Sequence, residues 1–193
     1  MERSPRVSPS EFLDRKLTRR FQTYDLDGNG HLDRADFDRA RDNLAAEYGL
    51  AADDPRVARL GTLMTGLWEH LLSVADTDAD QRISEQEYKR AFAAGLLETP
   101  ENFDSVYQPF LEAVMAIADT DGDGALTAED EVRWTRSLMA LPEADAREVH
   151  RRLDTDGDGR IGVREMLSAI REYYFDDSPG SAGEFLLGPI PRG

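Results

Sequence analysis

Four copies of one acidic pattern constrain the fold of this chain more than any other feature. The copies read DLDGNG, DTDADQ, DTDGDG and DTDGDG, and they begin at Asp25, Asp76, Asp119 and Asp154. The eighth position of every copy is aliphatic, with Leu32, Ile83, Leu126 and Ile161. A unit that recurs at this spacing indicates an architecture built from one repeated supersecondary element.

The segments before the acidic copies have the apolar spacing of helices. Leu13, Leu17 and Phe21 precede the first copy at helical intervals. The preceding Ser8-Pro9-Ser10-Glu11 has the pattern of a capping box with proline at the first helical position, which predicts a helix start at residue 9. Three more starts are predicted at Asp54-Pro55, Thr99-Pro100 and Leu141-Pro142.

A second helix is predicted after each acidic copy. Three of these starts have an N-cap residue placed three residues before an acid, at Asp33, Ser84 and Thr127. No segment alternates polar and apolar residues as a strand does, so strands should be limited to short pairings between loops. We therefore expect an all-α fold of four helix–loop–helix units.

The repeat also predicts how the chain is divided. We expect an N-terminal pair of units at 8–97, with acidic loops 25–36 and 76–87, and a C-terminal pair at 99–175, with loops 119–130 and 154–165. The tail 176–193 is rich in Gly, Pro and Ser, yet it contains Phe185, Leu186, Leu187 and Ile190. Because a solvated tail seldom has so many apolar residues, we favour docking on the body over disorder.

Composition restricts the partners and the chemistry. The chain has 39 Asp and Glu against 23 Lys and Arg, a net charge of −16, which argues against nucleic acid or an anionic membrane as partner. It has no cysteine, which excludes disulfides, thiolate metal sites and cysteine nucleophiles. We find no secretory signal pattern and no membrane-spanning run, so we expect a cytoplasmic protein. Small hard cations remain as the partner class.

The acidic loops have the ligand spacing of a calcium site. Such a loop of twelve residues supplies oxygens from positions 1, 3, 5 and 12, from the carbonyl of position 7 and often through water at 9, with glycine at 6. The fourth loop fits this pattern, with Gly159 at the turn and predicted ligands Asp154, Asp156, Asp158, the Arg160 carbonyl and Glu165.

The first and third loops end in aspartate where glutamate is usual. Their predicted ligands are Asp25, Asp27, Asn29, the His31 carbonyl and Asp36, and Asp119, Asp121, Asp123, the Ala125 carbonyl and Asp130. Aspartate has one methylene less than glutamate, so its carboxylate reaches less easily to bind calcium through both oxygens. This lowers the selectivity of the loop for calcium over magnesium. We expect both loops to bind metal, with Mg²⁺ competing against Ca²⁺.

The second loop keeps its oxygens but lacks glycine at position 6. Its predicted ligands are Asp76, Asp78, Asp80, the Arg82 carbonyl and Glu87. Gln81 at the turn would adopt a left-handed conformation at a cost of about 1 to 2 kcal/mol, which the attraction of four carboxylates for a cation could exceed. We expect three to four bound ions, with this loop as the weakest or empty site.

Other interpretations of the acidic pattern fit less well. The DxDxD motif of a phosphatase follows a buried strand and occurs once, whereas here it follows predicted helices and occurs four times. Dockerin modules also repeat such loops, but they are much shorter than this chain and are secreted. We find no GxSxG motif, no phosphate-binding loop and no catalytic triad, so we expect no enzymatic activity. We assign Trp68 and Trp134 to the core rather than to a cofactor pocket.

In these four loops the chain resembles the EF-hand superfamily. The uneven spacing, Asp36, the imperfect second loop and the apolar tail are similar to those of the calerythrin and sarcoplasmic calcium-binding protein family. The resemblance implies two lobes of paired hands packed together as one compact globule, and an intracellular calcium buffer, transporter or signalling role. Two departures are the intact carboxylates of loop 76–87 and the short arm of Asp130.

Two functional hypotheses follow. In the first, the chain is a monomeric buffer or store, in which ions stabilise a closed core. Its four internal methionines favour this hypothesis, because adaptable target grooves tend to be rich in methionine. In the second, the chain is a sensor whose groove opens with calcium for a protein partner, with the C-terminal tail as internal ligand.

Overall fold

The structure is a computed structural model that describes residues 10–95, 97, 99, 103–176 and 181–190. In the N-terminal half the elements are α1 (Glu11–Tyr24), β1 (His31–Leu32), α2 (Arg34–Glu47), α3 (Pro55–Ala75), β2 (Ile83–Ser84) and α4 (Glu85–Ala93). In the C-terminal half they are α5 (Phe103–Ala118), β3 (Ala125–Leu126), α6 (Ala128–Met139), α7 (Glu143–Leu153), β4 (Ile161–Gly162), α8 (Val163–Phe175) and the 3₁₀ helix η1 (Ala182–Phe185).

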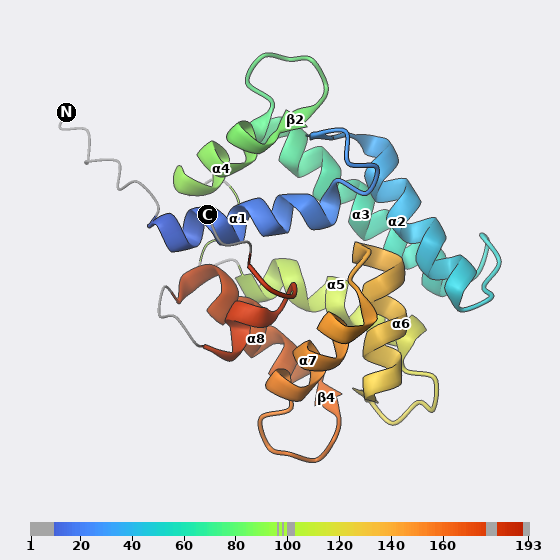
Figure 1. Cartoon of the computed structure of the whole chain (residues 1–193). Coiled ribbons are helices and arrows are strands. Elements are labelled where there is room, and N and C mark those ends of the chain that lie inside the picture. Colours follow the sequence, from blue (N-terminus) through green and yellow to red (C-terminus); the bar gives the residue numbers. More distant parts are fainter. Residues whose placement is uncertain (1–9, 96, 98, 100–102, 177–180, 191–193) are drawn as a thin grey trace.

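The helix–loop–helix units associate in pairs through two-residue strands. β1 pairs antiparallel with β2, which places Leu32 opposite Ile83, and β3 pairs with β4, which places Leu126 opposite Ile161. All four side chains are at most 1 % exposed. The loops of the two pairs point to opposite ends of the molecule, near β2 and β4 in Figure 1. The prediction of an all-α fold is confirmed, and in the part of the chain that the structure describes the strands are limited to these loop pairings.

Most of the predicted helix starts agree with the structure. Asp54 caps α3 with Pro55 at its first position, and α7 begins directly after Pro142. Asp33, Ser84 and Thr127 all form capping boxes. The predicted start at Thr99-Pro100 falls partly outside the described residues, and α5 is described from Phe103.

The predicted start of the first helix is wrong. The cap of α1 is Ser10, whose Oγ accepts a hydrogen bond of 3.0 Å from the backbone N–H of Leu13, so the helix begins at Glu11. Serine occurs at both positions 8 and 10, and the local pattern alone does not distinguish them. Leu17 and Phe21 are buried on α1, and their spacing is the same for either start, so it does not indicate which serine is the cap.

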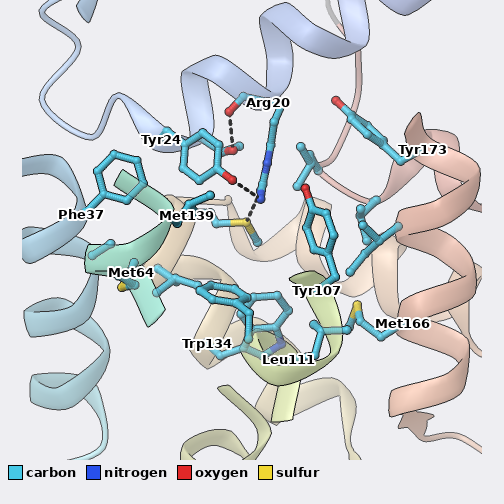
Figure 2. Close-up of a pocket in the computed structure, with 18 of the residues that line it drawn as sticks. Arg20, Tyr24, Phe37, Met64, Tyr107, Leu111, Trp134, Met139, Met166 and Tyr173 are labelled. Carbon is cyan, nitrogen blue, oxygen red and sulfur yellow. Dashed lines mark hydrogen bonds between the residues drawn. The ribbon is translucent and has the colours of Figure 1, made fainter. Parts of the chain in front are cut away.

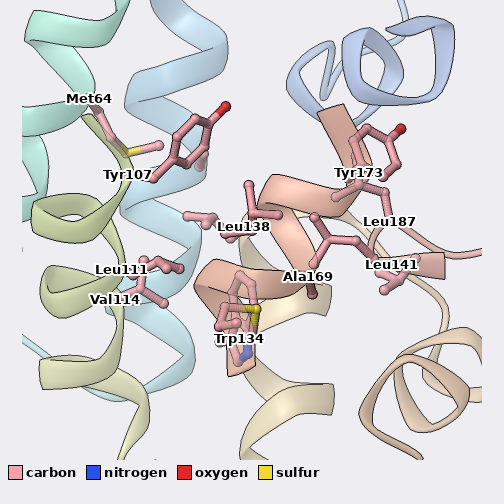
Figure 3. Close-up of a cluster of buried hydrophobic side chains, with 14 of the residues drawn as sticks. Met64, Tyr107, Leu111, Val114, Trp134, Leu138, Leu141, Ala169, Tyr173 and Leu187 are labelled. Atoms are coloured by element: carbon pink, nitrogen blue, oxygen red, sulfur yellow. The ribbon is translucent and has the colours of Figure 1, made fainter. Parts of the chain in front are cut away.

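One apolar core connects the two pairs. α2 packs on α6, α3 on α5 and α1 on α8, so helices of the first pair cover those of the second. Figure 3 shows this shared core, where Met64 of α3, Leu111 of α5, Trp134 of α6 and Tyr173 of α8 lie around one centre. Trp68 and Trp134 are each 5 % exposed, as expected for core residues. The four hands therefore form a single compact globule.

The C-terminal segment lies on the second pair. η1 packs against α8 and α7, and Leu186 and Leu187 are buried. The guanidinium of Arg19 in α1 donates a hydrogen bond of 2.7 Å to the carbonyl of Leu187, and the backbone N–H of Gly183 donates one of 3.0 Å to Glu172. The segment thus bridges α1 and α8. Within the described residues, no helix is long and apolar enough to cross a membrane.

Candidate metal centres

Each acidic loop gathers three carboxylates into one cluster. In each cluster, one oxygen from every member lies within 4.8 Å of the others. The clusters are Asp25–Asp27–Asp36, Asp76–Asp78–Asp80, Asp119–Asp121–Asp123 and Asp154–Asp156–Glu165. Oxygen anions held this close repel one another and fit a hard divalent cation.

The clusters omit some predicted ligands. Glu87 and Asp130, at position 12 of the second and third loops, lie outside their clusters, and so does Asp158 in the fourth. The residues predicted to ligate through carbonyls, His31, Arg82, Ala125 and Arg160, lie at or immediately before the strands. All four loops therefore bring their first and third positions together, but not the whole predicted ligand set.

The carboxylate at position 1 of each loop accepts a backbone hydrogen bond from position 6 of the same loop. One oxygen of Asp25 accepts a hydrogen bond of 2.9 Å from the backbone N–H at position 6, Gly30. The same contact joins Asp76 to Gln81 at 3.1 Å, Asp119 to Gly124 at 2.8 Å and Asp154 to Gly159 at 3.0 Å. This repeated contact closes the turn at position 6 in all four loops.

The carboxylate at position 12 connects the start of each loop to its exiting helix. Glu165 accepts hydrogen bonds of 3.0 Å from the N–H groups of Thr155 and Gly162, and Glu87 does the same with Thr77 and Ser84. The acid at position 12 is also the third residue of the following helix, where Glu87 completes the capping box of α4 and Asp130 that of α6. One side chain therefore stabilises both the helix start and the loop closure.

Of the two shorter aspartates, Asp36 still reaches both backbone partners and Asp130 reaches only one. Asp36 accepts from the N–H groups of Leu26 at 3.2 Å and Asp33 at 3.0 Å. Asp130 accepts from the N–H of Thr127 at 3.1 Å, but at the loop entrance it accepts only from the Thr120 hydroxyl, at 3.3 Å. The missing methylene thus loosens loop closure most at Asp130.

Protonation of these acids differs with their hydrogen bonds. Burial raises the pKa of Glu87, but hydrogen bonds from Ser84 and Thr77 outweigh it and bring the pKa to about 2. Burial raises the pKa of Asp36, and its backbone hydrogen bonds do not cancel the effect. A buried carboxylate whose charge is incompletely compensated is a position where a bound cation would contribute most.

Two residues of the second loop have left-handed backbone conformations without being glycine. Gln81 at position 6 has φ 64°, and Ala79 at position 4 has φ 61°. The other loops have glycine at position 4, at Gly28, Gly122 and Gly157, all with positive φ. The strain at Ala79 was missed in the sequence analysis, although the glycines of the other three copies contain the signal.

Arginine side chains approach two of the clusters. Arg160 was predicted to act only through its carbonyl, yet its guanidinium pairs with Asp123 and lies 3.5 Å from Asp121 in the neighbouring loop. Arg39 lies 3.7 Å from Asp27. The strand pairing that joins the third and fourth loops places Arg160 there, so sequence spacing within one loop contains no signal for it.

The family models match most of the chain. A model described as an EF-hand domain pair matches residues 14–93, and one described as EF hand matches residues 111–130 and 151–168. The chain belongs to the EF-hand family. It is 30 % identical over 161 residues to calerythrin of Saccharopolyspora erythraea, covering 83 % of this chain and 90 % of that protein.

Further relatives are consistent with this assignment. Sarcoplasmic calcium-binding protein 1 of Astacus leptodactylus is 28 % identical, covering 86 % of this chain and 90 % of the relative. The solved structure of a Streptomyces coelicolor calcium-binding protein is 41 % identical, with a TM-score of 0.73, covering 86 % of this chain and 99 % of that chain. The chain is therefore a calcium-binding EF-hand protein related to calerythrin and the sarcoplasmic calcium-binding proteins.

Proposed function

We propose that this EF-hand protein is a monomeric, cytoplasmic calcium buffer or store. The ions are held by the oxygens of loops 25–36, 119–130 and 154–165, and more weakly by loop 76–87, with Mg²⁺ competing where position 12 is Asp36 or Asp130. Three to four ions would offset much of the net charge of −16. The carboxylate clusters and the strained second loop support this order of affinities.

The main support for the buffer function is that the apolar faces of the two pairs of hands pack against each other. α2 covers α6 and α3 covers α5, and among the described residues the exposed large hydrophobic side chain is Val106, 45 % exposed. A sensor needs a groove that a partner helix can enter. Here the opposite pair of hands fills the position of such a groove.

Uptake of a hydrophobic dye tests the proposal. Dye fluorescence is measured on the full-length protein in magnesium buffer, with calcium and with chelator. A buffer predicts little change when calcium is added, because no new apolar surface appears. A marked increase in dye uptake with calcium contradicts the buffer function. Calorimetric titration of chelator-stripped protein counts the ions, with three to four expected.

The alternative is a sensor in which the tail is an internal ligand. Two observations favour it: Leu186 and Leu187 are buried against the body, and the Streptomyces coelicolor relative is described in terms of prokaryotic calcium-mediated regulation. Deletion of residues 176–193 separates the two functions. A buffer would remain monomeric with modest loss of stability, whereas a sensor would expose an adhesive groove and self-associate when calcium is present.

A further inference from the structure

The centre of the molecule contains a cavity apart from the metal loops, and of their predicted ligands Asp36 borders it. An inner cavity of about 60 Å³ lies where the two pairs of hands meet. Next to it, an outer hollow of about 280 Å³ opens between α3 and α5 and includes the exposed Val106. The two spaces are adjacent, since they share five lining residues, Arg20, Tyr24, Leu67, Tyr107 and Phe110.

Arg20 is the polar group at this junction. Its Nη2 donates a hydrogen bond of 2.6 Å to the hydroxyl of Tyr24, its Nη1 lies 4.0 Å from the sulfur of Met139, and its guanidinium carbon lies 4.1 Å from the centre of the Tyr24 ring (Figure 2). Its buried Nε has no hydrogen-bond partner. Within the described part of the chain, Arg20 forms no ion pair, and the ionisable groups that act on it are tyrosines, among them Tyr24, Tyr107 and Tyr173.

The surroundings of Arg20 are unusual for a chain with net charge −16. None of the nine residues that line the outer hollow is acidic, and His70 lies among them. The acid that lines the inner cavity is Asp36, and both of its oxygens accept hydrogen bonds from the first metal loop. A half-buried guanidinium whose Nε is buried and which has no carboxylate partner favours an anion that can supply the missing acceptor.

The size and lining of the two spaces indicate which chemical group the rest of the ligand contains. Tyr24, Tyr107 and Phe110 present aromatic rings to both spaces. An apolar cavity of about 150 Å³ suffices for benzene, so the outer hollow accommodates an aromatic ring and the inner cavity does not. A ring in the outer hollow would place a short acidic substituent at Arg20.

We propose that the hollow between α3 and α5 binds a small aromatic monocarboxylate, with its ring on Tyr107 and Phe110 and its carboxylate paired to Arg20. This site is independent of the calcium loops and of the choice between buffer and sensor. A long acyl chain would have to extend from the outer hollow into the inner cavity, which is only about 60 Å³. An aromatic ring fits within the outer hollow alone.

The test compares two probes of the same shape, 1-naphthylacetate and the neutral 1-naphthylacetamide. Both are titrated into the full-length, calcium-saturated protein, and calorimetry measures the binding of each. We expect the carboxylate to bind about tenfold more tightly than the amide, since hydrogen bonds to charged groups contribute about 1.5 to 3 kcal/mol. Equal binding of the two probes, or no binding of either, overturns the proposal.

Variants locate the site. Arg20→Gln should weaken the carboxylate about tenfold and leave the amide within about twofold, whereas Arg15→Gln, on the exposed side of the same helix, should change neither. Val106→Glu at the exposed mouth should weaken the carboxylate, and Val106→Lys should not. The Val106 pair keeps the proposal falsifiable if Arg20→Gln does not fold. Affinity for the carboxylate that is unaffected by Val106→Glu places the probe elsewhere and refutes the assignment.

Discussion

Two of the four loops end in aspartate, and at Asp130 the structure shows which contact the missing methylene removes. Asp130 accepts no backbone hydrogen bond at the entrance of its loop, whereas Glu165 accepts one from Thr155 at 3.0 Å. Asp36→Glu and Asp130→Glu should each increase the selectivity for Ca²⁺ over Mg²⁺ by about tenfold, equivalent to ~1.4 kcal/mol. Competition calorimetry measures this ratio. Glu165→Asp is the reverse control, and unchanged selectivity in both aspartate variants would refute the argument.

The second loop contains backbone strain at Ala79 and Gln81. A left-handed conformation costs a non-glycine residue about 1 to 2 kcal/mol. Ala79→Gly and Gln81→Gly should therefore each strengthen calcium binding to loop 76–87, and together about additively. Ala52→Gly, at an exposed position without positive φ, is the control and should only lower the free energy of unfolding slightly. If neither loop variant binds calcium more tightly, the loop is weak for a reason other than strain.

Glu131 is the residue with the clearest pH dependence. Its side chain is 1 % exposed and accepts a hydrogen bond of 2.7 Å from Nε1 of Trp134. Burial raises the pKa of Glu131 from 4.5 to about 8, although the Trp134 hydrogen bond lowers it. Because the folded protein retains this proton and the unfolded chain loses it, the free energy of unfolding should fall as pH rises from about 5 to 8, by at most ~1.4 kcal/mol per pH unit.

Glu131→Gln removes this titration and keeps a hydrogen-bond acceptor for Trp134. Relative to wild type, the variant should gain stability steadily as pH rises from 5 to 8 in calcium-saturated buffer. Chemical denaturation at each pH measures the difference. Glu129→Gln, on the exposed side of α6, is the control and should leave the pH dependence as it is. A wild-type profile parallel to that of Glu131→Gln would show that Glu131 does not titrate in this range.

At the scale of elements, the attachment of η1 depends on one close approach. A Cβ on Gly183 would overlap the carbonyl oxygen of Ala169 and come within 2.5 Å of Cβ of Glu172. Gly183→Ala should therefore detach the segment from α8 and increase amide exchange and proteolysis at 181–190. Gly66→Ala, where the added Cβ meets nothing within 4 Å, is the control. A protected segment in Gly183→Ala would show that the contact is not needed for docking.

The helices themselves were largely predictable from local sequence. Asp54-Pro55 and the three capping boxes mark helix starts because each cap satisfies backbone N–H groups within its own segment. The start of α1 was not predictable, since Ser8 and Ser10 are equivalent locally. The position of Arg160 beside Asp123 was also not predictable, because two loops distant in sequence create it.

At the scale of the whole molecule, bound cations oppose the repulsion of a net charge of −16. A ligand at a hundredfold excess over Kd stabilises the folded state by about 2.7 kcal/mol per site. Removal of three to four ions by chelator should therefore lower Tm by about 15 to 40 °C. Addition of 1 M NaCl, where the Debye length is about 3 Å, should restore part of the loss. A Tm independent of chelator, followed by circular dichroism, would contradict metal-linked stability.

The sequence by itself determined the repeated loops, most of the helices and the family, because these depend on residues close together along the chain. Ligand spacing, capping and apolar periodicity all act within a dozen residues or so. Only the tertiary structure decided how the two pairs of hands cover each other, how the tail lies on α8 and that Arg20 faces a hollow without a carboxylate partner. Those features depend on contacts between distant segments, for which one sequence contains no local signal.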